Sequence, residues 1–204
     1  MPHVVVRVYE DSGPLIGAIR ERQPEVEDIM RGVPGFISYA IMDTGQGALS
    51  VTTCQDKSGT DESIVRAADW IKTNLPDAKI ARPQIFEGDS LYRFVAPGMP
   101  TVGGNPHVVV RIFSTPPPQD VREGEARLRE MMSDVPGWRA YTAVDLGSGG
   151  LTVLACNDKT AADEIGQRMR QYVEANHPER LTGAPPQIIE AQGVFRFEAQ
   201  AAPV

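Results

Sequence analysis

The chain has 204 residues, of which 41% are apolar and 23% are charged, a composition that can build an ordinary hydrophobic core. Its formal net charge is −7 and its basic residues form no stripe, so we expect neither nucleic acid nor an anionic membrane as a partner. The N-terminus lacks a basic segment followed by a long apolar run, and the chain has no membrane-length apolar stretch, which predicts a cytoplasmic protein.

The sequence contains two copies of one unit. The segment PHVVVR at 2–7 recurs at 106–111, and VPGF at 33–36 recurs as VPGW at 135–138. The copies then run in step through further pairs: Tyr39 and Tyr141, Asp43 and Asp145, Cys54 and Cys156, Arg93 and Arg196. Residues 97–105 are rich in proline and glycine and are expected to be a linker. We therefore predict repeats at 1–96 and 106–204.

The first half of each copy predicts a strand, a helix and a hairpin. Residues 3–9 are rich in β-branched side chains, which favours a strand. Apolar residues then recur at helical spacing from Leu15 to Met30, which predicts one helix. Two β-rich runs, 36–42 and 48–53, are joined by a glycine-containing segment that is typical of a hairpin.

The second half of each copy predicts a helix and a last strand. Ser58 with Asp61, and Thr160 with Asp163, have the spacing of helix-capping pairs. The helix that follows in the first copy is expected to end near Pro76 and to bury one apolar stripe: Ile64, Ala67, Ala68, Ile71 and Leu75. The last strand of this copy is expected to finish at residues 91–95, and the second copy repeats the pattern.

This order of elements predicts an α+β protein. A βαββαβ unit forms an antiparallel, ferredoxin-like sheet with both helices on one face. On the first strand Val4, Val6 and Val8 point one way and Val5 points the other, so neither face suits solvent. We therefore expect two tandem ferredoxin-like repeats that form an intramolecular pseudo-dimeric α/β barrel. The chain would be a monomer of this kind or a homodimer.

The repeated residues resemble a known family. The run at 33–36, Tyr39, the hairpin glycines Gly45 and Gly47, and the segment 67–75 are similar to the dimeric α/β-barrel superfamily. More narrowly they resemble the antibiotic biosynthesis monooxygenase-like (ABM-like) group, here as a tandem fused copy. The resemblance covers both halves. It implies the barrel fold and leaves function open, because the family includes cofactor-free monooxygenases, haem-degrading enzymes, isomerases and proteins of no known activity.

The resemblance also implies catalytic positions. Quinone-forming members have a tryptophan on the second helix and an arginine on the last strand, which correspond here to Trp70 and Arg93, and in the second copy to Tyr172 and Arg196. Those members have an asparagine one turn before the tryptophan, where this sequence has Arg66 and Arg168. The first strand carries no asparagine, which haem-degrading members have, so we predict no haem and no other cofactor.

Ligand contacts are expected from the start of each copy. His3 with Arg7, and His107 with Arg111, place an imidazole and a guanidinium on one face of a strand. Such a pair can relay a proton and hold developing negative charge, as oxidation or isomerisation of a phenol or ketone requires. The alternative is a polar layer in which each arginine pairs with a carboxylate such as Asp43 or Asp145.

The remaining candidates also have a structural alternative. Tyr39 and Tyr141 are expected to line the ligand site. Trp70 and Tyr172 could form an aromatic wall of that site or instead fill the core. Arg93 and Arg196 could contact ligand or pair within the barrel. The two cysteines are explained by duplication as buried hydrophobes, and three histidines give a metal site little to use.

These observations lead to two hypotheses. In the first, the protein binds a small aromatic or anionic molecule between sheet and helices, with cofactor-independent oxygenation or isomerisation as the chemistry. In the alternative, it is a non-catalytic small-ligand-binding or stress-associated protein whose barrel is filled by side chains. The sequence leaves open whether the protein is an enzyme.

Overall fold

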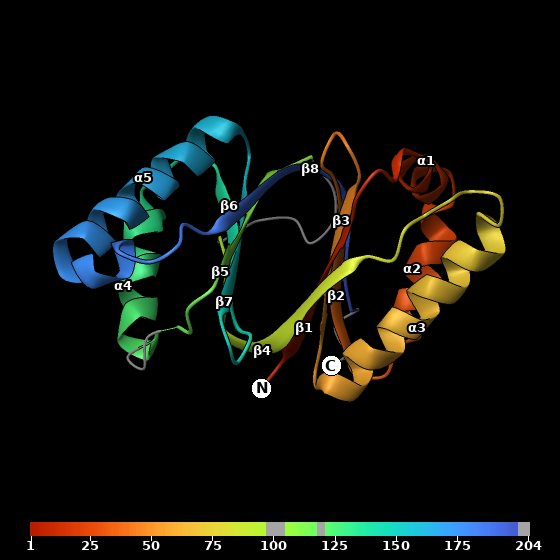
Figure 1. Ribbon diagram of the computed structural model, residues 1–204, viewed down its shortest axis with the longest axis horizontal. Helices are drawn as coiled ribbons and strands as arrows, with labels where there is room; N and C mark the ends of the chain where they lie inside the picture. Colours follow the sequence, from red (N-terminus) through yellow and green to blue (C-terminus); the bar gives the residue numbers. More distant parts are fainter. Residues whose placement is uncertain (97–104, 118–120, 200–204) are drawn as a thin grey trace. The chain divides into compact units, whose positions relative to one another are not determined.

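The structure is a computed structural model that describes residues 1–96, 105–117 and 121–199. Figure 1 shows its elements in chain order. The first repeat contains β1 (His3–Tyr9), α1 (Gly13–Glu21), α2 (Gln23–Arg31), β2 (Phe36–Asp43), β3 (Ala48–Cys54), α3 (Lys57–Asn74) and β4 (Gln84–Val95). The second contains β5 (His107–Phe113), α4 (Val121–Ser133), β6 (Trp138–Asp145), β7 (Gly150–Cys156), α5 (Lys159–Asn176), a 3-10 turn (Pro178–Leu181) and β8 (Gln187–Glu198).

The strands form the closed barrel that the sequence predicted. Their hydrogen-bonded sequence is β1-β3-β2-β8-β5-β7-β6-β4, and β4 also pairs with β1, so that the order closes as a barrel. The pairings of β1 with β3, of β5 with β7, and of β2 with β3 within the predicted hairpin are antiparallel. The predicted fold class, two tandem ferredoxin-like repeats forming a pseudo-dimeric α/β barrel, is confirmed at the level of topology.

The chain divides into two compact units whose limits differ from those of the repeats. Unit 1 comprises Met1–Asp89, Pro100–Asn105 and Ala191–Val204, and unit 2 comprises Ser90–Met99 and Pro106–Glu190. The last strand of each repeat therefore begins in one unit and ends in the other. The repeat boundaries at 96 and 106 stay a prediction, and residues 97–104 of the expected linker lie outside the described residues.

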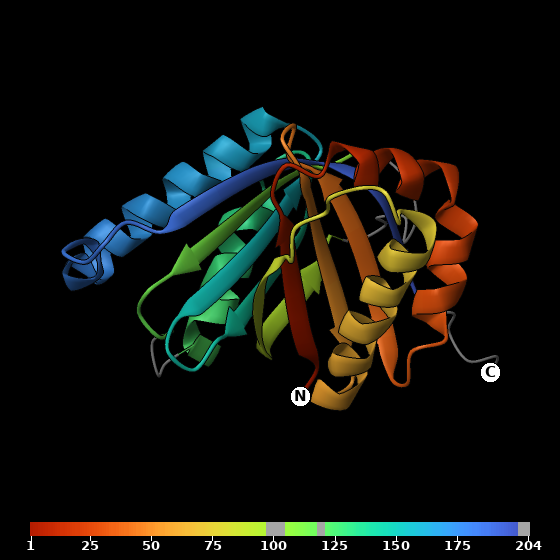
Figure 2. The same cartoon turned by 45° about the vertical axis from the view of Figure 1, so that its right-hand side comes forward.

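The helices of each unit cover one face of its sheet. Figures 1 and 2 show α1, α2 and α3 together on one side of the strands β1 to β3, and α4 and α5 on one side of β5 to β7. Side chains alternate along β1, so Arg7 lies on the face covered by α3 whereas Val4 and Val6 lie on the opposite face. Both valines are buried as well, as the sequence pattern indicated.

The expected first helix is two helices in the structure. The helix breaks at Arg22, whose φ of −115° and ψ of 30° are not helical, and α2 then restarts with Pro24 in its first turn. Proline has no N–H to continue the helix, and its ring clashes with the carbonyl of the residue four positions earlier. The prediction of a single helix from Leu15 to Met30 was therefore wrong, although its apolar spacing correctly indicated buried positions such as Leu15, Ile19 and Met30.

The caps of the long helices lie two residues earlier than predicted. The carboxylate of Asp56 accepts a hydrogen bond from the backbone N–H of Gly59 at 3.1 Å, and Asp158 accepts one from Ala161 at 2.9 Å. Asp61 and Asp163, which were expected to cap, form ion pairs on the outer face with Lys57 and Lys159. The buried stripe of α3 also differs, since Ala68 is exposed and Trp70 is buried.

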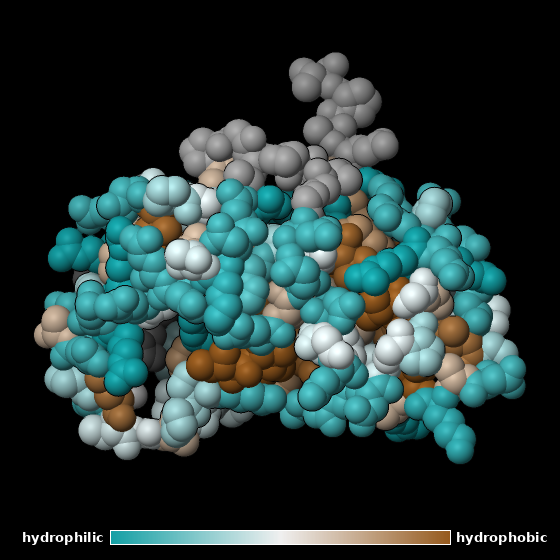
Figure 3. Space-filling model, turned by 90° about the horizontal axis from the view of Figure 1, so that it is seen from above, coloured by the Kyte–Doolittle hydropathy of each residue, from teal (hydrophilic) through white to brown (hydrophobic). Residues whose placement is uncertain are grey.

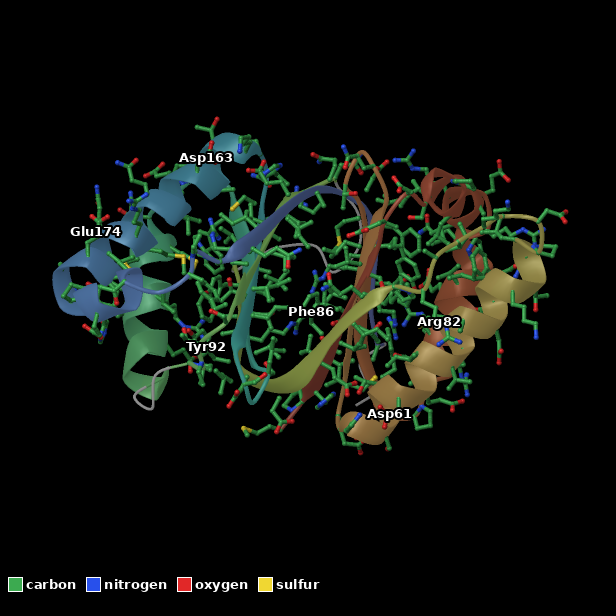
Figure 4. The ribbon with its side chains drawn as sticks, viewed as in Figure 1. Asp61, Arg82, Phe86, Tyr92, Asp163 and Glu174 are labelled. Atoms are coloured by element: carbon green, nitrogen blue, oxygen red, sulfur yellow. The ribbon has the colours of Figure 1, made fainter. Side chains whose placement is uncertain are left out.

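The aromatic core of each unit is completed by the last strand of the other repeat. In unit 1, Phe197 of β8 packs on Phe36 and Tyr39 with ring centroids 5.5 Å apart in both pairs. In unit 2, Phe94 of β4 packs on Tyr141 at 5.5 Å, and Tyr92 lies on the same side of β4 (Figure 4). Neither repeat therefore supplies all the aromatic rings of one core.

The face seen in Figure 3 is mainly hydrophilic. Figure 3 shows a face on which hydrophilic side chains predominate, with smaller hydrophobic patches between them. Large hydrophobic side chains that are exposed among the described residues are Met1, Val65, Ile85, Leu181 and Ile188. None of the helices in the described ranges combines the length and apolar character that crossing a membrane requires.

Candidate functional site

A buried guanidinium is the central polar feature of unit 1. Arg7 extends from β1 beneath α3 and is 1% exposed. Its Nη1 donates to Thr52 Oγ1 at 2.9 Å and to Ser50 Oγ at 3.4 Å, both on the neighbouring strand β3. Its Nη2 donates to Ser63 Oγ of α3 at 2.5 Å. The strand register places Ser50 directly opposite Arg7, and the helix brings Ser63 onto the sheet from above.

His3 belongs to the same polar layer. Its contact on α3 is Thr60, which lies about one helical turn before Ser63. Its Nδ1 lies 2.8 Å from Thr60 Oγ1, and the Thr60 hydroxyl donates to the backbone carbonyl of Lys57 at 2.9 Å. Because a hydroxyl has one proton, Thr60 accepts from His3, which places the proton of the neutral imidazole on Nδ1. The other ring nitrogen, Nε2, then carries the lone pair and can accept a proton.

The charge on Arg7 has no carboxylate partner among the described residues. Burial lowers the pKa of its guanidinium, and the neighbouring Tyr9, Tyr39 and Cys54 oppose this shift only in part. The alternative in which Arg7 pairs with Asp43 is wrong, because Oδ2 of Asp43 lies 3.4 Å from Nη2 of Arg20 at the surface. Hydroxyl groups can satisfy N–H donors, but they do not neutralise a buried positive charge.

The tyrosines and cysteines beside the arginines are held in their neutral forms. Burial raises the pKa of Tyr39 above its ordinary range and raises that of Tyr141 to about 12. Burial also raises the pKa of Cys54 to about 11 and that of Cys156 to about 12. A thiol is a nucleophile only as a thiolate, so these environments favour the structural role expected for both cysteines.

Unit 2 contains the same arginine in different surroundings. Arg111 is only partly buried, and burial lowers its pKa while Tyr141, Glu190 and Asp163 raise it. His107 Nε2 lies 3.5 Å from Glu190 Oε2, which also accepts from Lys159 at 2.9 Å. The positions of Thr52, Thr60 and Ser63 correspond to Leu154, Ala162 and Ile165. The duplicated arginines therefore differ in their surroundings: hydroxyl groups surround Arg7 in unit 1, whereas Arg111 in unit 2 has carboxylates nearby.

The four positions suggested for catalysis are divided between the two units, two in each. Trp70 lies in unit 1 and Arg93 in unit 2, although both come from the first repeat. Trp70 packs in the helix-covered core of unit 1. Arg196 also lies in unit 1, but it alternates with Phe195 and Phe197, which contact that core, so it occupies the opposite face of the sheet.

The other two positions, Tyr172 and Arg93, belong to unit 2. Tyr172 is partly buried on α5, where its ring lies 5.9 Å from that of His177. Arg93 alternates with Tyr92 and Phe94 on β4. Arg196 forms an ion pair with Glu198. The catalytic roles of Trp70, Arg93, Tyr172 and Arg196 stay predictions.

The sequence interpretation missed the hydroxyl groups that surround Arg7. Ser50 and Thr52 alternate on the predicted third strand, and Thr60 and Ser63 are three residues apart on the predicted helix. A comparison of the two copies could have revealed these hydroxyl groups, because three of the four positions have apolar residues in the second copy. Trp70 adds a further donor on this face of α3, since its buried Nε1 has no hydrogen-bond partner. Among the described residues there is no cluster of metal-binding side chains.

Comparison with known proteins indicates the fold. No family model and no curated protein matches the chain. A candidate monooxygenase from Fusobacterium nucleatum subsp. nucleatum has a similar structure, with a TM-score of 0.69 and 14% identity over 99% of this chain and 96% of that one. An anthrone oxidase-like protein has a TM-score of 0.62 and 15% identity, covering 98% and 94% of the respective chains.

A third structure connects the fold with a named group. A ferredoxin-fold protein from Listeria monocytogenes 4b F2365, related to antibiotic biosynthesis monooxygenases, has a TM-score of 0.54 and 9% identity over 95% of this chain and 94% of that one. At such low identity these similarities show the fold and carry no activity or ligand across.

Proposed function

We propose that this chain, which has the ABM-like dimeric α/β-barrel fold, binds a small aromatic or anionic molecule on the helix-covered face of unit 1. The observation that carries this proposal is the Arg7 guanidinium, buried among hydroxyl groups without a carboxylate. An uncompensated buried charge is costly for folding, and such features are concentrated at functional sites. The aromatic rings of Tyr39 and Phe197 in the same core favour a flat ligand.

The chemistry that fits this arrangement is cofactor-independent oxygenation. A ligand oxygen that becomes negatively charged during oxidation would be stabilised by Arg7. His3, with its lone pair on Nε2, would accept the proton that the ligand loses. Proteins of similar fold include an anthrone oxidase-like protein and a candidate monooxygenase, and our proposal extends oxidation chemistry of that kind to this chain.

Thermal shift measurements test the binding proposal. Phenols, quinones and flavins would be added to the protein, and a ligand at about 100 times its Kd should stabilise the folded state by about 2.7 kcal/mol. Oxygen uptake with each compound that binds then tests the chemistry. If no compound changes the melting temperature, the binding proposal fails; binding without oxygen uptake leaves binding standing and removes oxygenation.

The second candidate is a non-catalytic protein of the same fold, and the packing of Trp70 favours it. This side chain is 7% exposed and belongs to the hydrophobic core of unit 1 rather than to an open wall. A Trp70→Phe substitution separates the two candidates. A stacking residue would change ligand affinity or oxygen uptake, whereas a core residue would change only the stability.

A further inference from the structure

Two N–H donors of Arg7 have no acceptor. A guanidinium has five N–H groups, and the hydrogen bonds to Ser50, Thr52 and Ser63 use three of them. The buried Nε has no partner among the described residues, and Nη2, which carries two protons, makes one hydrogen bond, to Ser63. A partner that supplies two adjacent acceptor atoms and one negative charge would satisfy both the donors and the charge. A carboxylate is such a group, since arginine and carboxylate pair through two parallel hydrogen bonds.

The charged groups around the duplicated arginine differ between the units. In unit 2 the pKa of Arg111 is raised by Tyr141, Glu190, Asp163 and Cys156, and its buried Nη1 has no hydrogen-bond partner among the described residues. In unit 1 the groups that have this effect on Arg7 are two tyrosines and a cysteine. The hydroxyl groups that hold Arg7 in place, Thr52 and Ser63, are replaced in unit 2 by Leu154 and Ile165. Among the described residues, unit 1 therefore has the oriented cation without a carboxylate partner.

The strand register indicates how a ligand reaches Arg7. Ser50 is its neighbour on one side and Ile85 of β4 is its neighbour on the other. Ile85 is 41% exposed, so the guanidinium lies one strand away from solvent on that side. Arg82, on the segment between α3 and β4, is exposed and forms no ion pair among the described residues (Figure 4). An exposed cation beside this approach attracts anions.

We propose that unit 1, and not unit 2, binds a small aromatic carboxylate whose two oxygens pair with the unfilled N–H donors of Arg7. The inference rests on the proposed function and names the ligand group. The carboxylate enters over Ile85 and past Arg82. Its ring packs in the aromatic core that Tyr39 and Phe197 form, and Ser50, Thr52 and Ser63 fix the guanidinium for recognition.

Isothermal titration of the full chain with sodium benzoate tests the proposal. The wild-type protein is expected to bind one benzoate per chain. Arg7→Lys keeps the charge but loses the paired donors, and should weaken binding at least tenfold. Arg111→Lys is the matched control in unit 2 and should leave binding unchanged. Circular dichroism establishes that each variant is folded, and Ser63→Ala provides a milder change, expected to weaken binding severalfold.

The competing outcomes are distinguishable. Binding of phenol but not benzoate would overturn the carboxylate assignment and leave the proposed function intact. Phosphate or chloride that displaces benzoate at equal concentration would show a site for any small anion and would also overturn it. Two benzoates per chain, or equal losses in Arg7→Lys and Arg111→Lys, would contradict the restriction to unit 1. Failure of every aromatic compound to bind would remove the proposed function as well.

Discussion

Arg7 combines two properties that rarely occur together in a residue kept for stability. It is fully buried, and its positive charge faces hydroxyl groups rather than a carboxylate. Transfer of a charge from water to a protein interior carries a desolvation cost that neutral hydrogen bonds do not fully repay. We therefore expect the fold to tolerate loss of this charge better than the function does.

Replacement of Arg7 by methionine tests this expectation. Methionine fills most of the same space without a charge, so the free energy of unfolding should stay constant or rise by about 1 kcal/mol. Urea denaturation followed by circular dichroism measures it, with Arg111→Met as the control in unit 2. A loss of more than about 2 kcal/mol in Arg7→Met alone would assign a structural role to the guanidinium.

The buried cysteines predict a loss of stability at alkaline pH. The pKa of Cys54 is raised from 9.0 to about 11, so the unfolded chain loses the thiol proton at lower pH than the folded chain does. The contribution of this thiol to stability is complete below pH 9 and is lost as the pH rises towards 11. Urea midpoints at pH 8 and pH 10 should fall less in Cys54→Ala than in the wild-type chain. An equal fall in both proteins would contradict the shift.

At the scale of the elements, aspartate caps begin the long helices of both repeats. Asp56 and Asp158 each precede the helix and accept a hydrogen bond from the backbone three residues later. This arrangement satisfies an N–H group that the first helical turn leaves without a partner. The sequence predicted the helix start to within two residues, but the serine and threonine that follow the aspartates were equally plausible caps. Only the backbone conformation at Asp56 distinguishes them.

Substitution at the two positions measures the cap. Asp56→Ala should lower the melting temperature by about 2–4 °C, because it leaves the Gly59 N–H without an acceptor. Ser58→Ala is the matched control and removes only a hydrogen bond from the serine hydroxyl to Asp56. Its effect on the melting temperature should be the smaller of the two. A larger effect for Ser58→Ala would restore the original sequence prediction.

At the scale of the whole molecule, the last strands link the two repeats. β4 carries Tyr92 and Phe94 into unit 2, and β8 carries Phe195 and Phe197 into unit 1. A buried phenylalanine contributes several kilocalories per mole to stability, so a core that lacks two rings is strongly weakened. Each repeat therefore depends on the other for folding.

Separate expression of the repeats tests this dependence. Fragments 1–96 and 106–204 should not be folded monomers when alone, because each lacks the aromatic rings that complete its core. Light scattering of either fragment should report self-association, and mixing the two should give a one-to-one complex with the circular dichroism of the intact chain. A fragment that folds cooperatively as a monomer would contradict the argument.

The sequence by itself determined the duplication, the order of elements and the barrel topology, because these follow from local periodicity and from the need to bury both faces of a sheet. It also identified Arg7 and His3 as a polar pair on one face. Tertiary structure decided which groups surround them. The hydroxyls of Ser50, Thr52 and Ser63 come from a neighbouring strand and a distant helix, so no local pattern assigns them to Arg7.

Tertiary structure also decided which suggested catalytic residues share a unit. Trp70 and Arg93 belong to one repeat, yet the strand that carries Arg93 begins in unit 1 and ends in unit 2, so the two residues belong to different units. Strand length and pairing determine this crossing, and both depend on contacts between residues far apart in the chain. A repeat pattern shows that Arg7 and Arg111 occupy equivalent positions. The contacts of the folded chain determine whether each arginine has a carboxylate nearby.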